Sequence, residues 1–204
     1  ADLCSVRVHA ANKGSLVEDM QGVEYCMAML GRRIRPWLTS GACMISRTSA
    51  YQTILDNHST YFPGEDIEMG RAALHFKMKV MHHPAVVLTI VPDSWYDLVR
   101  QRRLWWAGSF RHSVVNFDHN LRYPIWLLYN AGAIWILLSF KWDVSWETLA
   151  FLPILMAAYI VLTVLSNWEV RSPLMVLFPL YALFQVMVMP LLGLITYIKL
   201  TDRK

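Results

Sequence analysis

The chain has 204 residues, of which 55% are hydrophobic and 17% are charged, and its formal net charge is +4. This composition excludes a disordered protein and is too apolar for an ordinary soluble domain. The charges are unevenly spread, because residues 1–122 hold 25 of the 34 Asp, Glu, Lys and Arg, whereas residues 123–198 hold five. We therefore expect a polar N-terminal part followed by a membrane part.

Residues 1–93 predict an alternation of strands and helices, which indicates an α/β fold. Apolar residues at three- and four-residue steps predict a helix over residues 15–30, which Gly31 ends. Further helices are expected over residues 49–56 and 66–79, and strands over residues 3–10, 38–46 and 80–91. Because the first strand needs a sheet to pack against and no signal peptide precedes it, we expect the sequence to start inside a domain.

Residues 94–115 predict an amphipathic helix with Ser94 as its N-cap. A helix rich in Arg and Trp that directly precedes apolar runs is typical of one lying in a membrane interface. Gln101 and Trp105 are four residues apart and so share one side of it. The alternative is a packing helix whose charges are merely solvated. In either case, the apolar face of the helix over residues 94–115 is predicted to carry Trp95, Leu98, Val99, Trp106, Phe110 and Val114.

Three uncharged runs follow, over residues 123–140, 149–165 and 174–198, and each predicts a transmembrane helix. The arginines of residues 94–122 place that side in the cytoplasm. The basic tail at residues 199–204 is also expected in the cytoplasm. Three spans, however, would put the two ends of the region on opposite sides of the membrane. Either the tail is an exception or one segment is interfacial or re-entrant, and Pro179 and Pro190 make the third run the candidate.

Several kinds of site are not expected. The cysteines Cys4, Cys26 and Cys43 form no Cys-x-x-Cys pair, so neither a disulfide framework nor a zinc site is indicated, and they suit a reducing compartment. His82 and His83 point to opposite faces of a strand, and we expect no metal site within this chain. No basic run resembles a nucleic-acid arm, so nucleic acid is not an expected partner.

Three short motifs occur in a fixed order before the apolar runs: Ser40-Gly41-Ala42, Gly64-Glu65-Asp66 and Gln101-Arg102-Arg103-Leu104-Trp105. Together with the helix pattern of residues 20–25, they resemble the processive family 2 glycosyltransferases, the membrane-embedded synthases of cellulose, chitin and hyaluronan. The resemblance covers nearly the whole chain. It implies that residues 1–93 are the acceptor-side part of a GT-A-like domain truncated at its N-terminus, residues 94–122 an interfacial helix region, and residues 123–204 a region of about three transmembrane helices.

The resemblance also implies an activity and its residues. We expect inverting transfer of a sugar from a nucleotide sugar, UDP-linked, to a growing β-linked polysaccharide, with export of the product. Asp66 would be the catalytic base and Glu65 its supporting neighbour. The expected substrate-binding residues are Ser40, Gly41, Ala42, Gly64, Gln101, Arg102, Arg103 and Trp105; among these, Gln101 and an arginine would bind the departing diphosphate, and Trp105 would stack on a sugar ring.

Two departures from the family pattern stand out. Leu104 occupies the position where the family has Arg, so whether Arg102 or Arg103 meets the nucleotide stays open. The sequence contains no Asp-x-Asp motif, so we expect the ligands of Mg²⁺ or Mn²⁺ in the missing N-terminal part. The resemblance further implies an integral protein of the plasma or inner membrane with its catalytic part in the cytoplasm. Neither the sugar nor the oligomeric state follows from it.

Two alternatives stay open. A non-processive enzyme that glycosylates a lipid would use similar motifs, and product length distinguishes it from a polysaccharide synthase. A transporter or membrane scaffold is the alternative outside enzymes. The three apolar runs hold no charged residue, whereas ion and proton paths usually need ionisable side chains.

Overall fold

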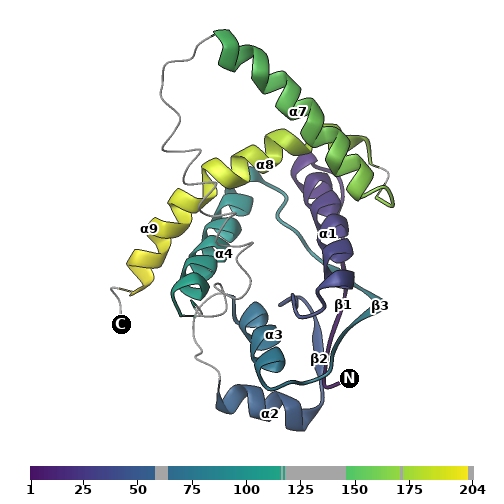
Figure 1. Cartoon of the computed structure of the whole chain (residues 1–204), viewed down its shortest axis with the longest axis vertical. Helices are drawn as coiled ribbons and strands as arrows, with labels where there is room; N and C mark the ends of the chain where they lie inside the picture. The colour runs from purple at the N-terminus through teal and green to yellow at the C-terminus, as the bar shows by residue number, and fades with distance from the viewer. Residues whose placement is uncertain (58–63, 116, 118–145, 171, 202–204) are drawn as a thin grey trace. The chain divides into compact units, whose positions relative to one another are not determined.

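A computed structural model describes residues 1–57, 64–115, 117, 146–170 and 172–201 (Figure 1). The chain divides into two compact units, Ala1–Gln101 and Arg102–Lys204. The predicted span over residues 123–140 lies outside the described residues.

The first unit is built on a three-stranded sheet with the order β2-β1-β3 (Figure 1). The central strand β1 (Leu3–Ala10) pairs antiparallel with β2 (Met44–Ser46) and parallel with β3 (Val80–Thr89). The strands predicted over residues 3–10 and 80–91 are therefore confirmed, the second ending two residues early. A small mixed sheet packed with helices is compatible with a GT-A-like α/β fold.

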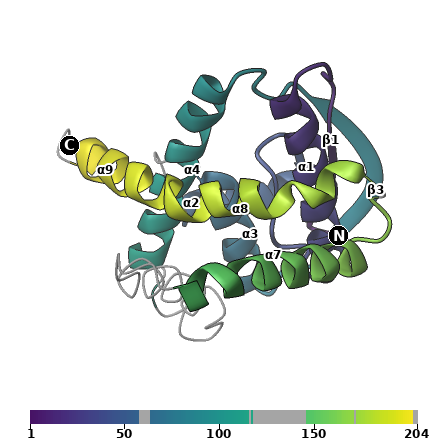
Figure 2. The same ribbon diagram turned by 90° about the horizontal axis from the view of Figure 1, so that it is seen from above.

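Helix α1 (Leu16–Ile34) covers the sheet and runs alongside β1 (Figure 2). Ser15 and Glu18 form a capping box at its start, with the Ser15 N–H donating to Glu18 Oε2 at 2.7 Å. The prediction that Gly31 ends this helix is wrong. One glycine costs a helix only about 1 kcal/mol, and the Gly31 carbonyl accepts a hydrogen bond from the Arg35 N–H at 3.0 Å. Pro36, which cannot continue the pattern, follows the last turn.

Two shorter helices cover the other part of the first unit, α2 (Thr48–Asp56) and α3 (Glu65–His75). Both confirm predicted helices, although α3 ends four residues earlier than expected. Leu3, Ile54, Met69 and Ala73 form a buried apolar cluster that joins β1 to these helices. Burial of such side chains is the main stabilising term for the sheet's attachment to α2 and α3.

The strand predicted over residues 38–46 is only partly present. Residues 44–46 form β2, but the small residues Ser40, Gly41 and Ala42 lie in a turn, closed by a hydrogen bond of 3.1 Å from the Cys43 N–H to the Ser40 carbonyl. The strand prediction fails here because the Gly41 N–H donates to the Asp66 side chain and the Thr39 N–H donates to the Trp37 carbonyl, rather than to a neighbouring strand.

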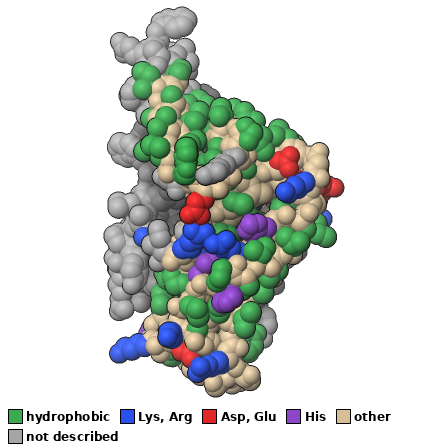
Figure 3. All heavy atoms as spheres, turned by 90° about the vertical axis from the view of Figure 1, so that its right-hand side faces the viewer, with side chains coloured by type: hydrophobic (Ala, Val, Ile, Leu, Met, Phe, Trp, Pro, Cys, Tyr) green, Lys and Arg blue, Asp and Glu red, His purple; other side chains and the backbone are tan. Residues whose placement is uncertain are grey.

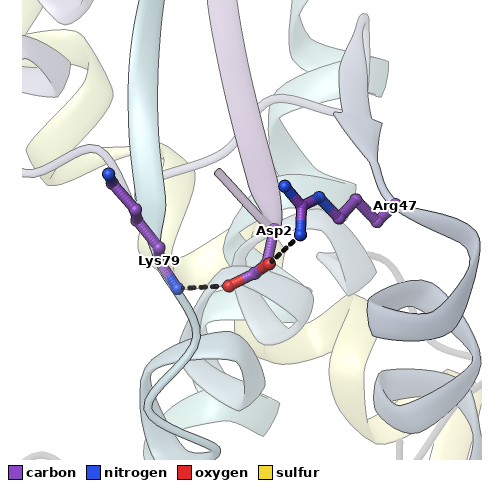
Figure 4. A network of polar contacts seen from close by, with 3 residues as sticks. All are labelled: Asp2, Arg47 and Lys79. Carbon is purple, nitrogen blue, oxygen red and sulfur yellow. Dashed lines mark hydrogen bonds and ion pairs between the residues drawn. The ribbon is translucent and has the colours of Figure 1, made fainter.

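Asp2 ties the edges of this unit together (Figure 4). Its carboxylate accepts a hydrogen bond from the Lys79 backbone N–H at 2.8 Å and pairs with the Arg47 guanidinium at 3.6 Å. Its backbone carbonyl also accepts from the Arg47 N–H at 3.0 Å. One residue therefore links the segments that lead into α2 and β3, which keeps the two pocket-forming helices next to the sheet.

Helix α4 (Trp95–Val115) begins in the first unit and confirms the helix predicted from Ser94. The Ser94 hydroxyl accepts from the Asp97 N–H at 3.2 Å and donates to the Asp97 carboxylate at 2.7 Å. Of the predicted apolar face, Leu98 is fully buried, whereas Trp95 and Val114 are exposed.

The second unit contains α7 (Trp146–Ser166), a 3₁₀ turn η1 (Pro173–Val176), α8 (Phe178–Met187) and α9 (Met189–Thr201). Within the described residues, one helical stretch is long and apolar enough to cross a bilayer: α8 and α9 together, Phe178–Thr201, with a mean hydropathy of 1.9. Helix α7 covers the predicted span at residues 149–165, and its apolar stretch of described residues, Met156–Leu165, is shorter.

Candidate active site

An open pocket of about 570 Å³ lies in the first unit between β2, α2, α3 and the 40–41 turn. Two of the predicted motifs meet in it, because Ser40 and Gly41 come from the turn and Glu65 and Asp66 from the first turn of α3. The rest of its lining is Met44, Ile45, Ser46, Thr48, Tyr51 and Met69. The pocket therefore combines a carboxylate wall with an apolar and hydroxyl-bearing wall.

Asp66 is held in place by the turn on both its backbone and its side chain. Its Oδ2 accepts a hydrogen bond of 2.7 Å from the Gly41 N–H, across 25 residues of sequence. Its backbone carbonyl accepts a hydrogen bond from the Thr39 hydroxyl, and Thr39 is buried. With one contact on its carboxylate and one on its backbone, Asp66 keeps a fixed direction relative to the pocket, as a proton acceptor requires.

The start of α3 explains why a glycine precedes the acids. Gly64 is the N-cap residue, and its φ of 102° lies in the left-handed region that side chains other than glycine rarely adopt. The first turn then carries Glu65, Asp66 and Glu68, whose negative charge interacts favourably with the positive end of the helix. Gly64 thus shapes the backbone at this point and is not part of the pocket lining.

Figure 3 shows Lys and Arg side chains gathered beside His on one face of the molecule. Burial lowers the pKa of Arg32, at the end of α1, while the nearby Asp66 carboxylate raises it. His82 lies opposite Ser5 in the β1–β3 pair, with its Nδ1 2.8 Å from the Ser5 hydroxyl. Burial lowers the pKa of His82 first of all, and positive charge lowers it further, from Arg32, Arg7, Arg33 and His83.

The lowered pKa of His82 predicts a pH-dependent stability. The folded state resists protonation of this imidazole. The contribution of His82 to the free energy of unfolding is therefore fully present above the unfolded pKa of about 6.5, and it is lost as the pH falls through the lower folded pKa. Replacing His82 with glutamine should flatten that decline. Urea unfolding of both proteins between pH 5 and 8 measures this decline. An unchanged slope in the His82 variant would contradict the assignment.

The third motif divides between the two units. Gln101 is the last residue of the first unit, whereas Arg102, Arg103 and Trp105 belong to the second. The Arg102 guanidinium lies 4.0 Å over the Trp105 ring, a cation–π contact between neighbouring turns of α4. Arg103 is exposed, and Trp105 is 44% exposed. The structure therefore places Ser40, Gly41, Glu65 and Asp66 together in the pocket lining, which contains no residue of the third motif.

The sequence motifs did not include several other residues that line the pocket. Thr48 and Tyr51 are one turn apart on α2, and Met69 is one turn after Asp66 on α3. That i, i+3 spacing is the signal that could have found them, since side chains at this spacing share a helix face.

A family model described as glycosyl transferase family group 2 matches residues 7–195, which includes all three motifs. No curated protein matches the chain. Because the match extends over most of the sequence and the pocket contains the expected carboxylates, the chain belongs to glycosyl transferase family group 2, whose members transfer a sugar from a nucleotide-sugar donor to an acceptor.

Proposed function

We propose that this chain is the acceptor-side and membrane part of a processive, inverting glycosyltransferase that extends a β-linked polysaccharide from a UDP-sugar and exports it. The observation that supports this most is the hydrogen bond between the Gly41 N–H and Asp66 Oδ2 at the wall of an open pocket. It joins two motifs of the family resemblance in one place and orients a carboxylate toward a space large enough for a sugar ring.

In the proposed reaction, the Asp66 carboxylate takes the proton from an acceptor hydroxyl about 3 Å away. The hydroxyl oxygen forms a bond to the anomeric carbon of the donor from the face opposite the nucleotide. The bond from that carbon to the phosphate oxygen breaks, and the electron pair leaves with the nucleoside diphosphate. Glu65, also in the pocket lining, supports Asp66, and Ser40 offers a hydroxyl for a sugar oxygen.

The departing diphosphate gains negative charge, and stabilising it needs donors and cations. We assign this to Gln101 together with an arginine of the same motif. Because the Arg102 guanidinium is stacked on Trp105, the exposed Arg103 is the better candidate for the phosphates. Trp105 would then present a flat face to the sugar at the start of the export path, with Arg102 behind it.

The proposal includes Mg²⁺ or Mn²⁺ with ligands from outside this chain. Among the residues that the structure describes, no group of three or more His, Cys, Asp or Glu side chains could hold a metal ion. These residues do not fit the metal by themselves, and no step above is assigned to it.

We also propose that the protein is integral to the plasma or inner membrane, with its catalytic part in the cytoplasm. Support comes from the apolar helix Phe178–Thr201 and from the arginines of residues 94–122, which favour the cytoplasmic side. The exposed Trp95 and Tyr96 at the start of α4 suit contact with lipid head groups.

The test is sugar transfer by the full-length protein in nanodiscs, supplied with radiolabelled UDP-sugars and Mg²⁺ or Mn²⁺. We expect product of high molecular weight from one donor, which would also identify the sugar. Short product that extracts into organic solvent would replace the proposal with a lipid glycosyltransferase. Absence of transfer from every donor would favour a non-enzymatic membrane protein.

A further inference from the structure

Three polar side chains bind the short segment that leads into α4. This segment, Val91-Pro92-Asp93, is called the 91–93 linker here. The Asn12 amide donates to the Val91 carbonyl at 2.8 Å and accepts from the Val91 N–H at 2.8 Å. Gln21 Nε2 donates to the Pro92 carbonyl at 2.8 Å, and the Ser15 hydroxyl donates to the Asp93 carbonyl at 2.9 Å. Each linker residue is thus bound by one side chain of what we name the polar clamp: Asn12, Ser15 and Gln21.

Gln21 is a polar residue at a fully buried position of α1. It lies on the side of α1 that also buries Val17. Its Nε2 makes a second hydrogen bond, of 3.1 Å, to the Val17 carbonyl, while its Oε1 has no hydrogen-bond partner in the described part of the chain. Burying an amide is unfavourable unless its hydrogen bonds are made, and a methionine would fill the same space without that cost. Packing alone therefore does not account for the glutamine, whereas its bond to Pro92 does.

Asn12 acts as an extension of the sheet. The β1–β3 ladder continues with a hydrogen bond of 2.8 Å from the Ala11 N–H to the Thr89 carbonyl, and the Asn12 side chain then replaces the backbone as partner of Val91. Glu18 orients this amide by accepting from it. Hydrogen bonds from the Ser15 N–H and from Asn12 lower the pKa of Glu18, so its carboxylate is charged at neutral pH. The capping box of α1 thereby also supports the clamp.

The linker determines where α4 begins. Ser94 follows it directly as the N-cap, and Leu98, in the first turn of the helix, is fully buried. Gln101 lies less than one turn further along and belongs to the same unit as Asp66. Since a helix transmits a displacement of its first turn along its axis, the position of Gln101 relative to Asp66 depends on the linker.

We infer that Asn12, Ser15 and Gln21 are positioning residues that set the location of Gln101 relative to the proposed base. This inference rests on the proposed function, in which Gln101 binds the departing diphosphate. None of the three side chains lines the pocket, so their influence on sugar transfer passes through α4.

A double-mutant cycle tests this coupling in the full-length enzyme. Gln21→Met, Gln101→Ala and the double variant are compared by kcat and KM for the nucleotide sugar. Gln21→Met alone should lower kcat/KM about tenfold, but less than twofold in the Gln101→Ala background, because its effect requires Gln101. Losses that simply multiply would overturn the inference. Met20→Leu, at a buried neighbour outside the clamp, is the matched control and should leave kcat/KM unchanged.

Hydrogen–deuterium exchange gives a readout that does not depend on activity. The amides of residues 98–101 should exchange at least tenfold faster in Gln21→Met than in the wild type, and unchanged exchange would overturn the inference. Faster exchange in a protein that transfers no sugar from any donor would instead reject the proposed function and, with it, the role assigned to Gln101. If Gln21→Met does not fold, Asn12→Ser enters the same cycle and the same exchange measurement, with the same outcomes expected.

Discussion

Replacing Asp66 with asparagine is expected to lower the turnover of sugar transfer by about 10²–10⁴-fold, the usual contribution of a positioned general base. The asparagine carbonyl can still accept the hydrogen bond that the Gly41 N–H now donates to Asp66 Oδ2. The hydrogen bond from the Thr39 hydroxyl is also unaffected, because its acceptor is the backbone carbonyl of residue 66. The variant should therefore keep its fold and its donor affinity while losing the proton acceptor.

The measurement compares kcat for radiolabelled product with donor binding by the same protein. Asp19→Asn is a suitable control, since Asp19 is likewise an acid in the first turn of a helix, α1, and does not line the pocket. It should change kcat less than twofold. Wild-type turnover in the Asp66 variant would remove Asp66 from the role of base, and lost donor binding would show that the residue acts on the donor site instead.

The sequence predicted the helix starts well, because their signals are local. Ser94 was predicted as an N-cap, and its hydroxyl does cap α4 through Asp97; the helix predicted over residues 15–30 begins with a capping box of Ser15 and Glu18, again three residues apart. The acids at the start of α3 are local in the same sense. Contacts within one turn can be inferred from spacing alone.

The site itself depends on contacts between distant segments, and there the sequence was less informative. The residues around Gly41 were predicted to form a strand with small residues in its middle, yet the Gly41 N–H is bound by Asp66, 25 residues later. The clamp spans even more, since Asn12 binds Val91 across 79 residues. The motifs indicated which residues belong to the site, but only the fold shows that the 40–41 turn orients the carboxylate.

The glycines inside helices also show that distant contacts are hard to predict from sequence. Two such glycines, Gly31 and Gly70, have very different surroundings. Gly31 was expected to end α1, but it lies inside the helix, and a Cβ at that position would meet nothing within 4 Å. Gly70 lies inside α3, where a Cβ would overlap the carbonyl oxygen of Trp37 and approach Thr39 Oγ1 at 3.2 Å. Nothing in the neighbouring sequence distinguishes the two positions.

Gly70→Ala is therefore expected to lower the free energy of unfolding by about 3 kcal/mol, the upper part of the usual range for overpacking. The obstacle is backbone rather than the end of a flexible side chain, so either α3 or the segment at Trp37 must move. Gly31→Ala should instead raise the free energy of unfolding by about 0.5–1 kcal/mol, because alanine favours a helix and the position is open.

Gly70 also lies one turn after Asp66 on α3, and both face residues 37–41: Gly70 at the Trp37 carbonyl, Asp66 at Thr39 and Gly41. Separating α3 from this segment would lengthen the bond that orients the carboxylate. Gly70→Ala should thus lose sugar transfer even at temperatures where it stays folded, whereas Gly31→Ala keeps it. Urea unfolding combined with the transfer assay distinguishes these effects, and a Gly70→Ala protein with wild-type stability and turnover would mean that the close contact of α3 with Trp37 does not exist in solution.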